Sequence, residues 1–275
     1  MALSSNENSN SNSTTSNARQ PLIPGYNSSD ERKALRNKLR AEAKQTRSEM
    51  PAPYRAHKSA ELCKRLEESL ALTLGITGMN AADVTIAVYA AFPEEVDLQD
   101  FIESAYAQGC KIAFPCMVRD AWNSLEHPSS TEMTKSRESE KTLENLPQDE
   151  TNSSAVQQTM EMRLVSAEHF RAHQVPFLNN PLKRYCHSDC ELDPYPYVSA
   201  RDLTMIVVPV VGFDSQGNRL GYGAGNYDRY LTQISKEATN NQGIICRVVG
   251  VAFAEQQVED VPTEEHDIPL AIVAL

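Results

Sequence analysis

The sequence has no apolar run that approaches the roughly 20 residues of a membrane-spanning helix. Its beginning, MALSSNENSNSNSTTSN, has neither a basic segment nor an apolar core, so we expect no signal peptide. The six cysteines show no spacing typical of a secreted disulfide framework. We therefore expect a cytoplasmic protein that does not enter a membrane.

Basic residues are scarce relative to acidic ones: 26 Lys and Arg stand against 37 Asp and Glu, and the net charge is −11. A protein that binds nucleic acid by neutralising phosphates over its whole surface needs the opposite balance, so we expect no nucleic-acid partner. The bases are nevertheless concentrated, because residues 31–65 carry eleven of them and only four acids. Such a basic segment in an acidic chain indicates a local site for an anionic ligand.

Two segments have too little apolar surface to fold. Residues 1–30 contain eight Ser and six Asn, and we expect a disordered tail there. Residues 120–160 carry eight acids and three bases without helical or strand periodicity, which is typical of a polar insert in a loop. What remains is long enough for one core. We therefore expect a single domain over 31–275 that follows the tail and contains the insert.

Helical and strand patterns alternate along this domain. We expect a first helix capped by Asp30, a second with Leu62, Leu66 and Leu70 on one stripe, a third over 98–108 capped by Asp97, and a fourth over 226–236. The expected strands cover 84–89, 111–114 with an end at Pro115, 162–165, 205–211, 248–253 and 268–273. Strands that are apolar throughout indicate a mostly parallel sheet between two layers of helices. We predict a three-layer, Rossmann-like α/β/α fold with its ligand site at the carboxyl ends of the strands.

A glycine-rich segment follows the most apolar strand. Residues 212–229 read GFDSQGNRLGYGAGNYDR and hold five of the eleven glycines. Glycine lets backbone N–H groups converge on an anion, and Arg219 adds a planar guanidinium suited to phosphate oxygens. The helix expected from Asn226 directs its positive end to the same place, and Asp228 in its first turn can hold a magnesium ion that bridges phosphates. The segment therefore predicts a phosphate site, and a purely structural turn is the alternative.

Two common phosphate motifs are excluded. Gly212 and Gly217 have the spacing of a P-loop, but Asn218 and Arg219 stand where that loop requires Lys and Ser or Thr. The later glycines read G-x-G-x-G, which lacks the G-x-G-x-x-G spacing of the dinucleotide-binding turn. The phosphate site is therefore of another kind.

Five elements occur in an order that matches one known family. The run VPVVGFDSQGNRLGYGAGNYDRYL is specific, and RKALR at 32–36, AAFPEEVD at 90–97, the strand at 160–165 and the segment 250–267 accompany it. Together they resemble the 5-formyltetrahydrofolate cyclo-ligase family, also called methenyltetrahydrofolate synthetase. The resemblance implies that ATP and magnesium drive the conversion of 5-formyltetrahydrofolate to 5,10-methenyltetrahydrofolate. ATP phosphorylates the formyl oxygen, N10 of the folate attacks, and phosphate leaves.

The resemblance also implies roles for particular residues. ATP would be bound by Arg32, Lys33, Arg36, Arg219, Leu220, Gly221, Tyr222, Gly223, Ala224, Gly225, Asn226 and Tyr227. The folate would contact Ala90, Glu95 and Tyr227, magnesium would be held by Asp228 and Asp267, and Arg219 and Asp228 would be catalytic. The partners would be ATP and 5-formyltetrahydrofolate, bound by a monomer. Without the family, the bases of the first helix could form a solvated face, and Glu95 could be a carboxylate favoured by a helix N-terminus.

One residue departs from the family's pattern, and one cluster of residues resembles a metal site. Asn226 stands where the family usually has an aromatic residue before Tyr227. His169, His173, Cys186 and Cys190 have the residue types of a zinc site, but their order favours solvated histidines and reduced cysteines.

Two other functions are compatible with the sequence. One is an enzyme on a similar α/β scaffold that acts on a sugar phosphate or a coenzyme A ester. The other is a folate- or nucleotide-binding protein without turnover. The first would need a catalytic base beside the glycine-rich turn, where the sequence offers only Asp228.

Overall fold

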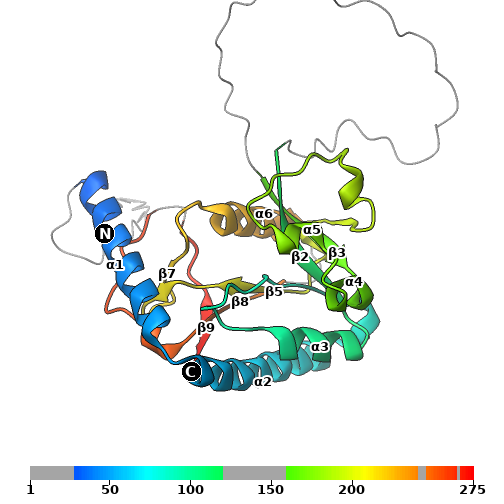
Figure 1. Ribbon diagram of the computed structural model, residues 1–275, viewed down its shortest axis with the longest axis horizontal. Coiled ribbons are helices and arrows are strands. Elements are labelled where there is room, and N and C mark those ends of the chain that lie inside the picture. The colour runs from blue at the N-terminus through cyan, green and yellow to red at the C-terminus, as the bar shows by residue number, and fades with distance from the viewer. Residues whose placement is uncertain (1–27, 120–158, 241–245, 265–266) are drawn as a thin grey trace, which may run out of the picture.

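The computed structural model describes residues 28–119, 159–240, 246–264 and 267–275. Within them a seven-stranded sheet lies between two layers of helices (Figure 1). Helices α2 (Ala52–Thr77) and α3 (Gln99–Ala107) cover one face, and α6 (Asn226–Asn240) covers the other. This confirms the predicted α/β fold. The expected tail and insert lie almost entirely outside the described residues and stay predictions.

The sheet is mostly parallel, as predicted. Its strand order is β4 (Tyr197–Val198), β3 (Thr159–Val165), β2 (Lys111–Val118), β1 (Thr85–Ala87), β5 (Met205–Pro209), β8 (Arg247–Ala252) and β9 (Ala271–Ala274). The five strands from β2 to β9 in this order are parallel, and β3 and β4 are antiparallel additions at one edge. The order turns back between β1 and β5, which is the place where open α/β sheets leave a crevice for a ligand.

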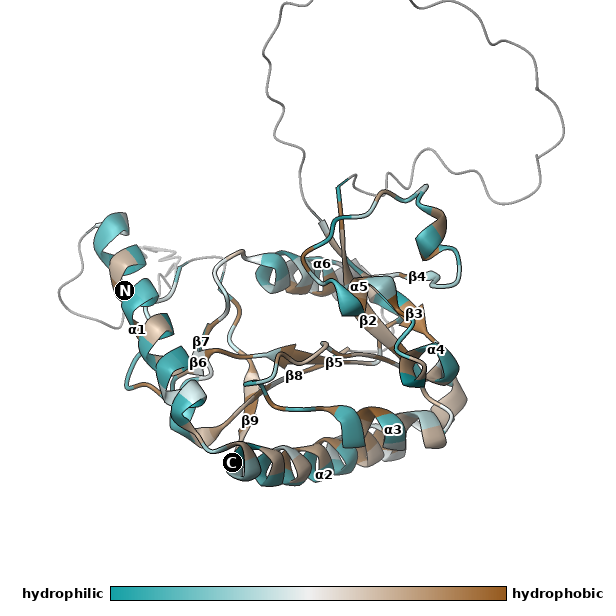
Figure 2. Ribbon diagram, in the orientation of Figure 1, coloured by the Kyte–Doolittle hydropathy of each residue, from teal (hydrophilic) through white to brown (hydrophobic). Residues whose placement is uncertain are grey.

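The core forms on both faces of the sheet, because successive side chains of a buried strand point to opposite sides. Ile86 of β1 packs into the cluster that contains Leu62, Leu66 and Leu70 of α2, which confirms the predicted stripe. Ala87, the next residue, belongs to the cluster beneath α6. Figure 2 shows the central strands in hydrophobic colours and much of the outer surface of the helices in hydrophilic ones. This rigid centre fixes the positions of the loops at the strand ends.

Helix α1 (Ser29–Glu49) lies outside the three layers (Figure 1). It contacts the small hairpin of β6 (Gly212–Phe213) and β7 (Arg219–Leu220) and the short helix η4 (Ala254–Gln256). Its start was predicted wrongly, because Ser28 and not Asp30 is the N-cap. The Ser28 hydroxyl accepts from the Glu31 amide at 3.2 Å, and the Glu31 carboxylate accepts from the Ser28 amide at 3.3 Å. This reciprocal capping box fixes the first turn of α1.

Two other predicted boundaries were also wrong. Helix α3 begins at Gln99 with Leu98 in the N-cap position, although the Asp97 carboxylate does accept from the Gln99 amide at 3.0 Å. Strand β2 continues through Pro115, which pairs with Met162 of β3. The carbonyl of Ala113 accepts a hydrogen bond from the Val88 amide, on the side of the strand that faces β1. Pro115 lies two residues further on and faces the same side, where β1 has already ended. Its missing N–H therefore removes no ladder bond.

Short elements make up the rest of the described chain: η1 (Ala81–Asp83), α4 (Ala167–Arg171), α5 (Pro176–Asn179), η2 (Cys190–Leu192) and η3 (Ala200–Asp202). Helices α4 and α5 follow β3, and α5 contacts β2. The strand expected over 268–273 is present as β9, shifted towards the end of the chain.

Candidate functional site

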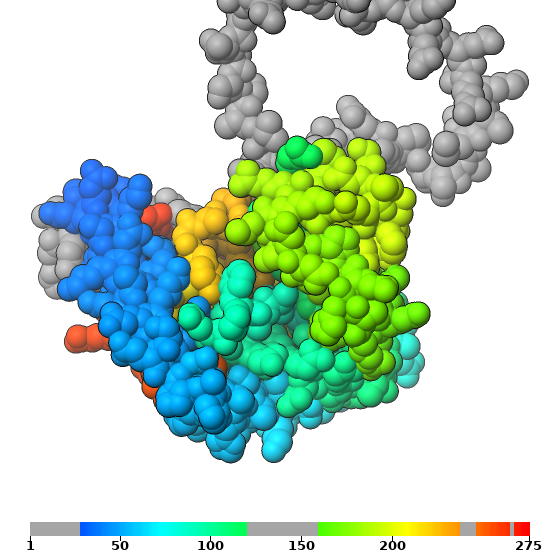
Figure 3. Space-filling model, viewed as in Figure 1, coloured from blue at the N-terminus to red at the C-terminus, as the bar shows by residue number. Residues whose placement is uncertain are grey.

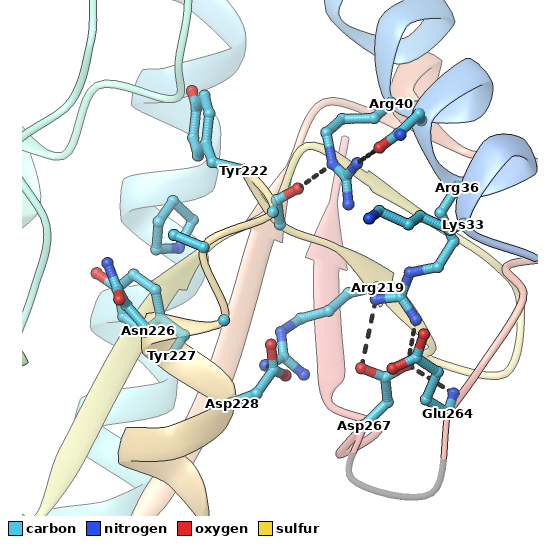
Figure 4. A pocket seen from close by; sticks show the side chains of 16 residues that line it. Lys33, Arg36, Arg40, Arg219, Tyr222, Asn226, Tyr227, Asp228, Glu264 and Asp267 are labelled. Atoms are coloured by element: carbon cyan, nitrogen blue, oxygen red, sulfur yellow. Dashed lines mark hydrogen bonds and ion pairs between the residues drawn. The ribbon is translucent and has the colours of Figure 1, made fainter. Parts of the chain in front are cut away.

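A cavity of about 520 Å³ lies between α1, the loop after β7 and the first turn of α6 (Figure 4). Its lining consists of Lys33, Arg36, Asn37, Arg40, Pro209, Arg219, Gly221, Tyr222, Gly223, Ala224, Gly225, Asn226, Tyr227, Asp228, Glu264 and Asp267. In Figure 3 the face of the molecule is hollowed between the blue surface of α1 and the yellow surface that follows β7. Pro209 ends β5, so the cavity lies at the carboxyl end of that strand, as the sequence predicts.

Most of the residues predicted to bind ATP come together in this cavity. Two do not: Arg32 is outside the lining, and Leu220 is fully buried in β7. Four lining residues were not predicted as site residues: Asn37, Arg40, Pro209 and Glu264. The spacing of Lys33, Arg36 and Arg40 along α1 places them on one helical face. That spacing is a signal by which sequence reasoning could have found Arg40.

The first two glycines of the motif serve a hairpin and not the cavity. Gly217 has a φ of +80°, and a Cβ there would lie 2.3 Å from the carbonyl oxygen of Leu270. The buried Asp214 carboxylate accepts from the backbone N–H groups of Gln216, Asn218 and Val261 and from the Asn218 side chain. The segment between β6 and β7 is therefore a tight structural turn, which was the alternative for the whole motif.

The last three glycines of the motif form one wall of the cavity, which we call the glycine wall: Gly221, Gly223 and Gly225. Gly223 has a φ of +101° and Gly225 has a φ of +65°, both in the region that L side chains rarely adopt. A Cβ on Gly223 would lie 3.5 Å from Cζ of Arg40, so the backbone passes close to that guanidinium. Helix α6 begins at Asn226, directly after Gly225, and its first backbone N–H groups have no partners within the helix. The wall therefore combines a close backbone approach with the positive end of a helix dipole.

Arg36 is held by the segment that follows β8. Its guanidinium donates to both carboxylate oxygens of Asp267 and, at 3.0 Å, to the carbonyl of Pro262 (Figure 4). Burial alone would lower the pKa of Arg36, but the hydrogen bond and the charge of Asp267 outweigh it and raise the pKa. Arg36 therefore stays charged at the wall of the cavity.

Arg219 is held in the same way by α6. Its guanidinium donates to Asp228 at 2.5 Å and to the carbonyl of Ile268 at 2.5 Å, and its side chain is 4 % exposed. Each of the two carboxylates predicted to hold magnesium, Asp228 and Asp267, therefore has an arginine partner. Among the residues that the structure describes, no group of three or more His, Cys, Asp or Glu could hold a metal ion.

Within the described residues the Arg40 guanidinium donates to two uncharged acceptors. Its Nε donates to the carbonyl of Gly221 at 2.6 Å, and Nη1 donates to Oδ1 of Asn37 at 2.6 Å. Burial and the nearby charge of Arg36 lower the pKa of Arg40. Burial is the larger of the two causes, and the contribution of Arg36 reflects the two guanidinium groups that line the same cavity and could attract an anionic ligand.

Glu95 is buried behind the cavity and does not line it. Its Oε1 accepts from the Tyr222 hydroxyl at 2.5 Å and lies 3.7 Å from Nη1 of Arg47, and its Oε2 accepts from the Phe92 amide at 2.9 Å. Burial, followed by the charge of Glu95, raises the pKa of Tyr222 to about 12. Tyr222 is therefore a neutral hydrogen-bond donor at physiological pH. This contact could not be read from the sequence.

Tyr227 and Asn226 occupy the first turn of α6. Burial, followed by the charge of Glu95, raises the pKa of Tyr227 well above its usual value. Tyr227 lines the cavity, and its predicted contact with the folate stays a prediction. Asn226, which replaces the family's aromatic residue, donates to Sδ of Met117 and accepts from Arg229 at 2.6 Å.

Ala90, the third residue predicted to contact folate, lines a separate cavity of about 220 Å³. That cavity has an apolar wall that includes Phe114 and Phe170, whose rings stack at 5.5 Å, and His173 is at its edge with a φ of +53°. Ala90, Glu95 and Tyr227 are therefore not brought into one open cavity.

The candidate zinc ligands have other contacts. His169 contacts the Ser166 hydroxyl at 3.2 Å, and Asn179 donates to the carbonyl of His173. Cys186 and Cys190 are free thiols. The interpretation that the sequence order favours for these residues stays a prediction.

The fold and the cavity define an α/β protein with an arginine-lined, glycine-walled cavity at the carboxyl end of β5 in a mostly parallel sheet. Residues 186–275 match the model of the 5-formyltetrahydrofolate cyclo-ligase family, which confirms the resemblance predicted from the sequence. The matched segment contains Arg219, the glycine wall, Asp228 and Asp267. None of the helices among the described residues has the length and apolar character needed to cross a membrane.

Three curated or solved proteins illustrate the similarity. A 5-formyltetrahydrofolate cyclo-ligase of Haemophilus influenzae is 45% identical over 69 residues, which are 25% of this chain and 33% of the relative. That of Escherichia coli K12 is 29% identical over 195 residues, which are 69% of this chain and 76% of the relative. A solved 5,10-methenyltetrahydrofolate synthetase of Mycoplasma pneumoniae aligns at 16% identity with a TM-score of 0.49, over 86% of this chain and 96% of that one. The first curated relatives are thus matched over a third of their length.

Proposed function

We propose that this protein is an ATP- and magnesium-dependent 5-formyltetrahydrofolate cyclo-ligase that acts as a cytoplasmic monomer. The observation that carries the proposal is the meeting of α1, the glycine wall and the start of α6 around one cavity, within the segments that resemble the family. The curated relatives that match the chain carry this name. The ligands would be ATP and 5-formyltetrahydrofolate.

The charges of the cavity favour a polyphosphate. Lys33 and Arg40 bring positive charge to the side formed by α1, and carboxylate partners orient the guanidinium groups of Arg36 and Arg219. The glycine wall and the start of α6 offer backbone N–H groups on the opposite side. A triphosphate placed between the two sides would offset the repulsion between Arg36 and Arg40, which together with burial, the larger cause, lowers the pKa of Arg40.

The chemical difficulty in this reaction is that the oxygen of a formamide leaves poorly. In the proposed reaction the formyl oxygen attacks the γ-phosphorus of ATP and ADP leaves. N10 of the folate then attacks the formyl carbon, and inorganic phosphate carries the former formyl oxygen away. The task of the protein is to align the two substrates and to stabilise negative charge on the phosphoryl oxygens, and no nucleophilic side chain is required.

Arg219 is the residue best placed to stabilise the transferred phosphoryl group. Asp228 and the Ile268 carbonyl fix its guanidinium, so little reorganisation is needed when charge develops. Asp228 would in turn orient Arg219 and contact the metal. We propose both as the catalytic residues.

Magnesium fits this cavity as an ion that arrives with the nucleotide. Such ions are commonly held by one or two carboxylates together with substrate phosphates, so a cage of three protein ligands is not required. Asp228 and Asp267 both line the cavity and would supply those carboxylates. The ion would neutralise phosphate charge.

The folate would bind on the side of Glu95. Its carboxylate can accept hydrogen bonds from the pterin N–H groups, and Tyr227 would provide a ring beside it. Ala90 lies in the loop that leads from β1 to Glu95, so one loop would supply both contacts to the folate.

The proposal is tested with the purified full chain, ATP, magnesium and 5-formyltetrahydrofolate. We expect absorbance of the methenyl product to appear only when ATP is present. Binding of both ligands without product at high enzyme concentration would identify a protein without turnover. Binding of neither ligand would overturn the proposal and leave an enzyme for another phosphorylated substrate.

A further inference from the structure

Tyr222 separates the arginine-lined cavity from Glu95. The tyrosine lines the cavity, whereas Glu95, to which its hydroxyl donates at 2.5 Å, does not. Arg47 donates to the same hydroxyl at 3.0 Å, and Nζ of Lys44 lies 4.6 Å from the ring centre. The ring of Phe92 meets it edge-on at 5.9 Å. Tyr222 thus joins the glycine wall, α1 and the loop after β1.

This arrangement leaves the Glu95 carboxylate covered. Its side chain is 4 % exposed, and each of its oxygens already accepts a hydrogen bond, one from Tyr222 and one from the Phe92 amide. The hydrogen bond from the Phe92 amide lies within the loop that carries Glu95, and Arg47 is as deeply buried as Glu95. Of the two side chains that contact the Glu95 carboxylate within the described residues, Tyr222 is exposed, at 42 % of the residue, and Arg47 is buried. A substrate that reaches Glu95 from the cavity must therefore displace Tyr222.

The backbone around Tyr222 permits such a movement. Glycines flank it on both sides, nothing lies within 4 Å of a Cβ placed on Gly221, and Gly223 already adopts a φ of +101°. A tyrosine between two glycines can change its direction at low conformational cost. The ring contacts of Lys44 and Phe92 are at the surface and are individually weak.

We infer that Tyr222 is a positioning residue. In the free protein its hydroxyl is hydrogen-bonded to the Glu95 carboxylate, and it leaves that carboxylate when the pterin of the incoming substrate binds there. The inference rests on the proposed function, because it requires a substrate that binds Glu95. The hydroxyl of Tyr222 and the N–H groups of the substrate compete for the same carboxylate oxygen. The apparent affinity for the folate is then reduced by the fraction of molecules in which Tyr222 holds Glu95.

The test replaces only the competing hydroxyl. Tyr222→Phe keeps the ring, with its contacts to Lys44 and Phe92, and removes the hydrogen bond to Glu95 together with the one from Arg47. Because a hydrogen bond to a charged group is being lost from the free state, we expect KM for 5-formyltetrahydrofolate to fall by about tenfold. Titration calorimetry with 5-formyltetrahydrofolate alone should show the same gain in affinity.

Tyr54→Phe is the matched control. Tyr54 is 39 % exposed, and its hydroxyl also donates to a glutamate, Glu255, at 2.7 Å, but it lies outside the cavity. We expect this variant to keep the KM and kcat of the natural sequence. Glu95→Gln, assayed beside both, should weaken folate binding.

The outcomes separate this inference from the proposed function. Tighter folate binding in Tyr222→Phe supports the inference, since damage to the fold would weaken binding. If the natural sequence is active and Tyr222→Phe binds folate equally or less tightly, the inference is wrong and the proposed function stands. If the natural sequence neither binds nor converts the folate, the proposed function fails and the inference fails with it.

Discussion

The guanidinium of Arg36 on α1 donates to both carboxylate oxygens of Asp267, which follows Arg36 by 231 positions in the chain. The same guanidinium donates to the carbonyl of Pro262 at 3.0 Å. These bonds join α1 to the segment after β8 and thereby close one side of the cavity. The arrangement leaves the charge of Arg36 at the cavity wall, where the phosphates of a nucleotide would lie.

Arg36→Gln removes this charge and one side of the contact. We expect KM for ATP to rise by at least about tenfold, because hydrogen bonds to charged groups contribute roughly 1.5–3 kcal/mol. Steady-state kinetics with varied ATP measures the effect. The matched control is Lys38→Gln, since the Lys38 side chain is on the same helix, is 71% exposed, pairs with Glu42 and lies outside the cavity lining. Equal KM values for both variants would show that Arg36 does not contact the nucleotide.

Gly223→Ala tests the backbone of the cavity wall. Alanine at a φ of +101° is strained, and its Cβ would approach the Arg40 guanidinium. We expect weaker ATP binding in calorimetry while the circular dichroism spectrum is unchanged. Gly75→Ala in α2 is the control, because nothing lies near a Cβ there; it should stabilise the protein by roughly 0.5–1 kcal/mol and leave ATP binding alone. Full ATP affinity in Gly223→Ala would contradict the proposed role of the wall.

Asp214→Ala tests the separation of the motif into a structural and a functional half. The buried carboxylate accepts four hydrogen bonds within and next to the β6–β7 turn, so we expect the free energy of unfolding to fall by about 2–4 kcal/mol. Denaturation with urea measures this loss. Asp193→Ala, at an exposed position, should change the free energy by less than about 0.5 kcal/mol. A loss below 1 kcal/mol for Asp214→Ala would mean that the turn is held by other contacts.

The sheet was predictable where apolar strands alternate with helices, and less so at its antiparallel edge. Pro115 reads as a strand terminator in the sequence, and only the register shows that its nitrogen faces a place that β1 does not reach. The helix start at Ser28 was missed because two adjacent serines and an aspartate all precede the helix pattern. Which of these residues caps the helix depends on which side chain reaches the amide of the third helical residue, and that is set by the local backbone geometry.

The site was predictable to the extent that its residues lie in one motif or on one helical face. Arg219 and the glycine wall are close in sequence, and α1 supplies Lys33, Arg36 and Arg40 at helical spacing. The ion pairs of Arg36 and Arg219 and the contact between Tyr222 and Glu95 join distant segments. These contacts depend on tertiary packing, so no spacing in the sequence predicts them.

The central claim is that the formyl oxygen is phosphorylated at this site, and oxygen labelling tests it most directly. The protein is incubated with ATP, magnesium and 5-formyltetrahydrofolate labelled with oxygen-18 in the formyl group, and the released phosphate is examined by mass spectrometry. If the formyl oxygen is phosphorylated, each phosphate formed together with the methenyl product carries one labelled oxygen. Methenyl product accompanied by unlabelled phosphate would contradict the claim.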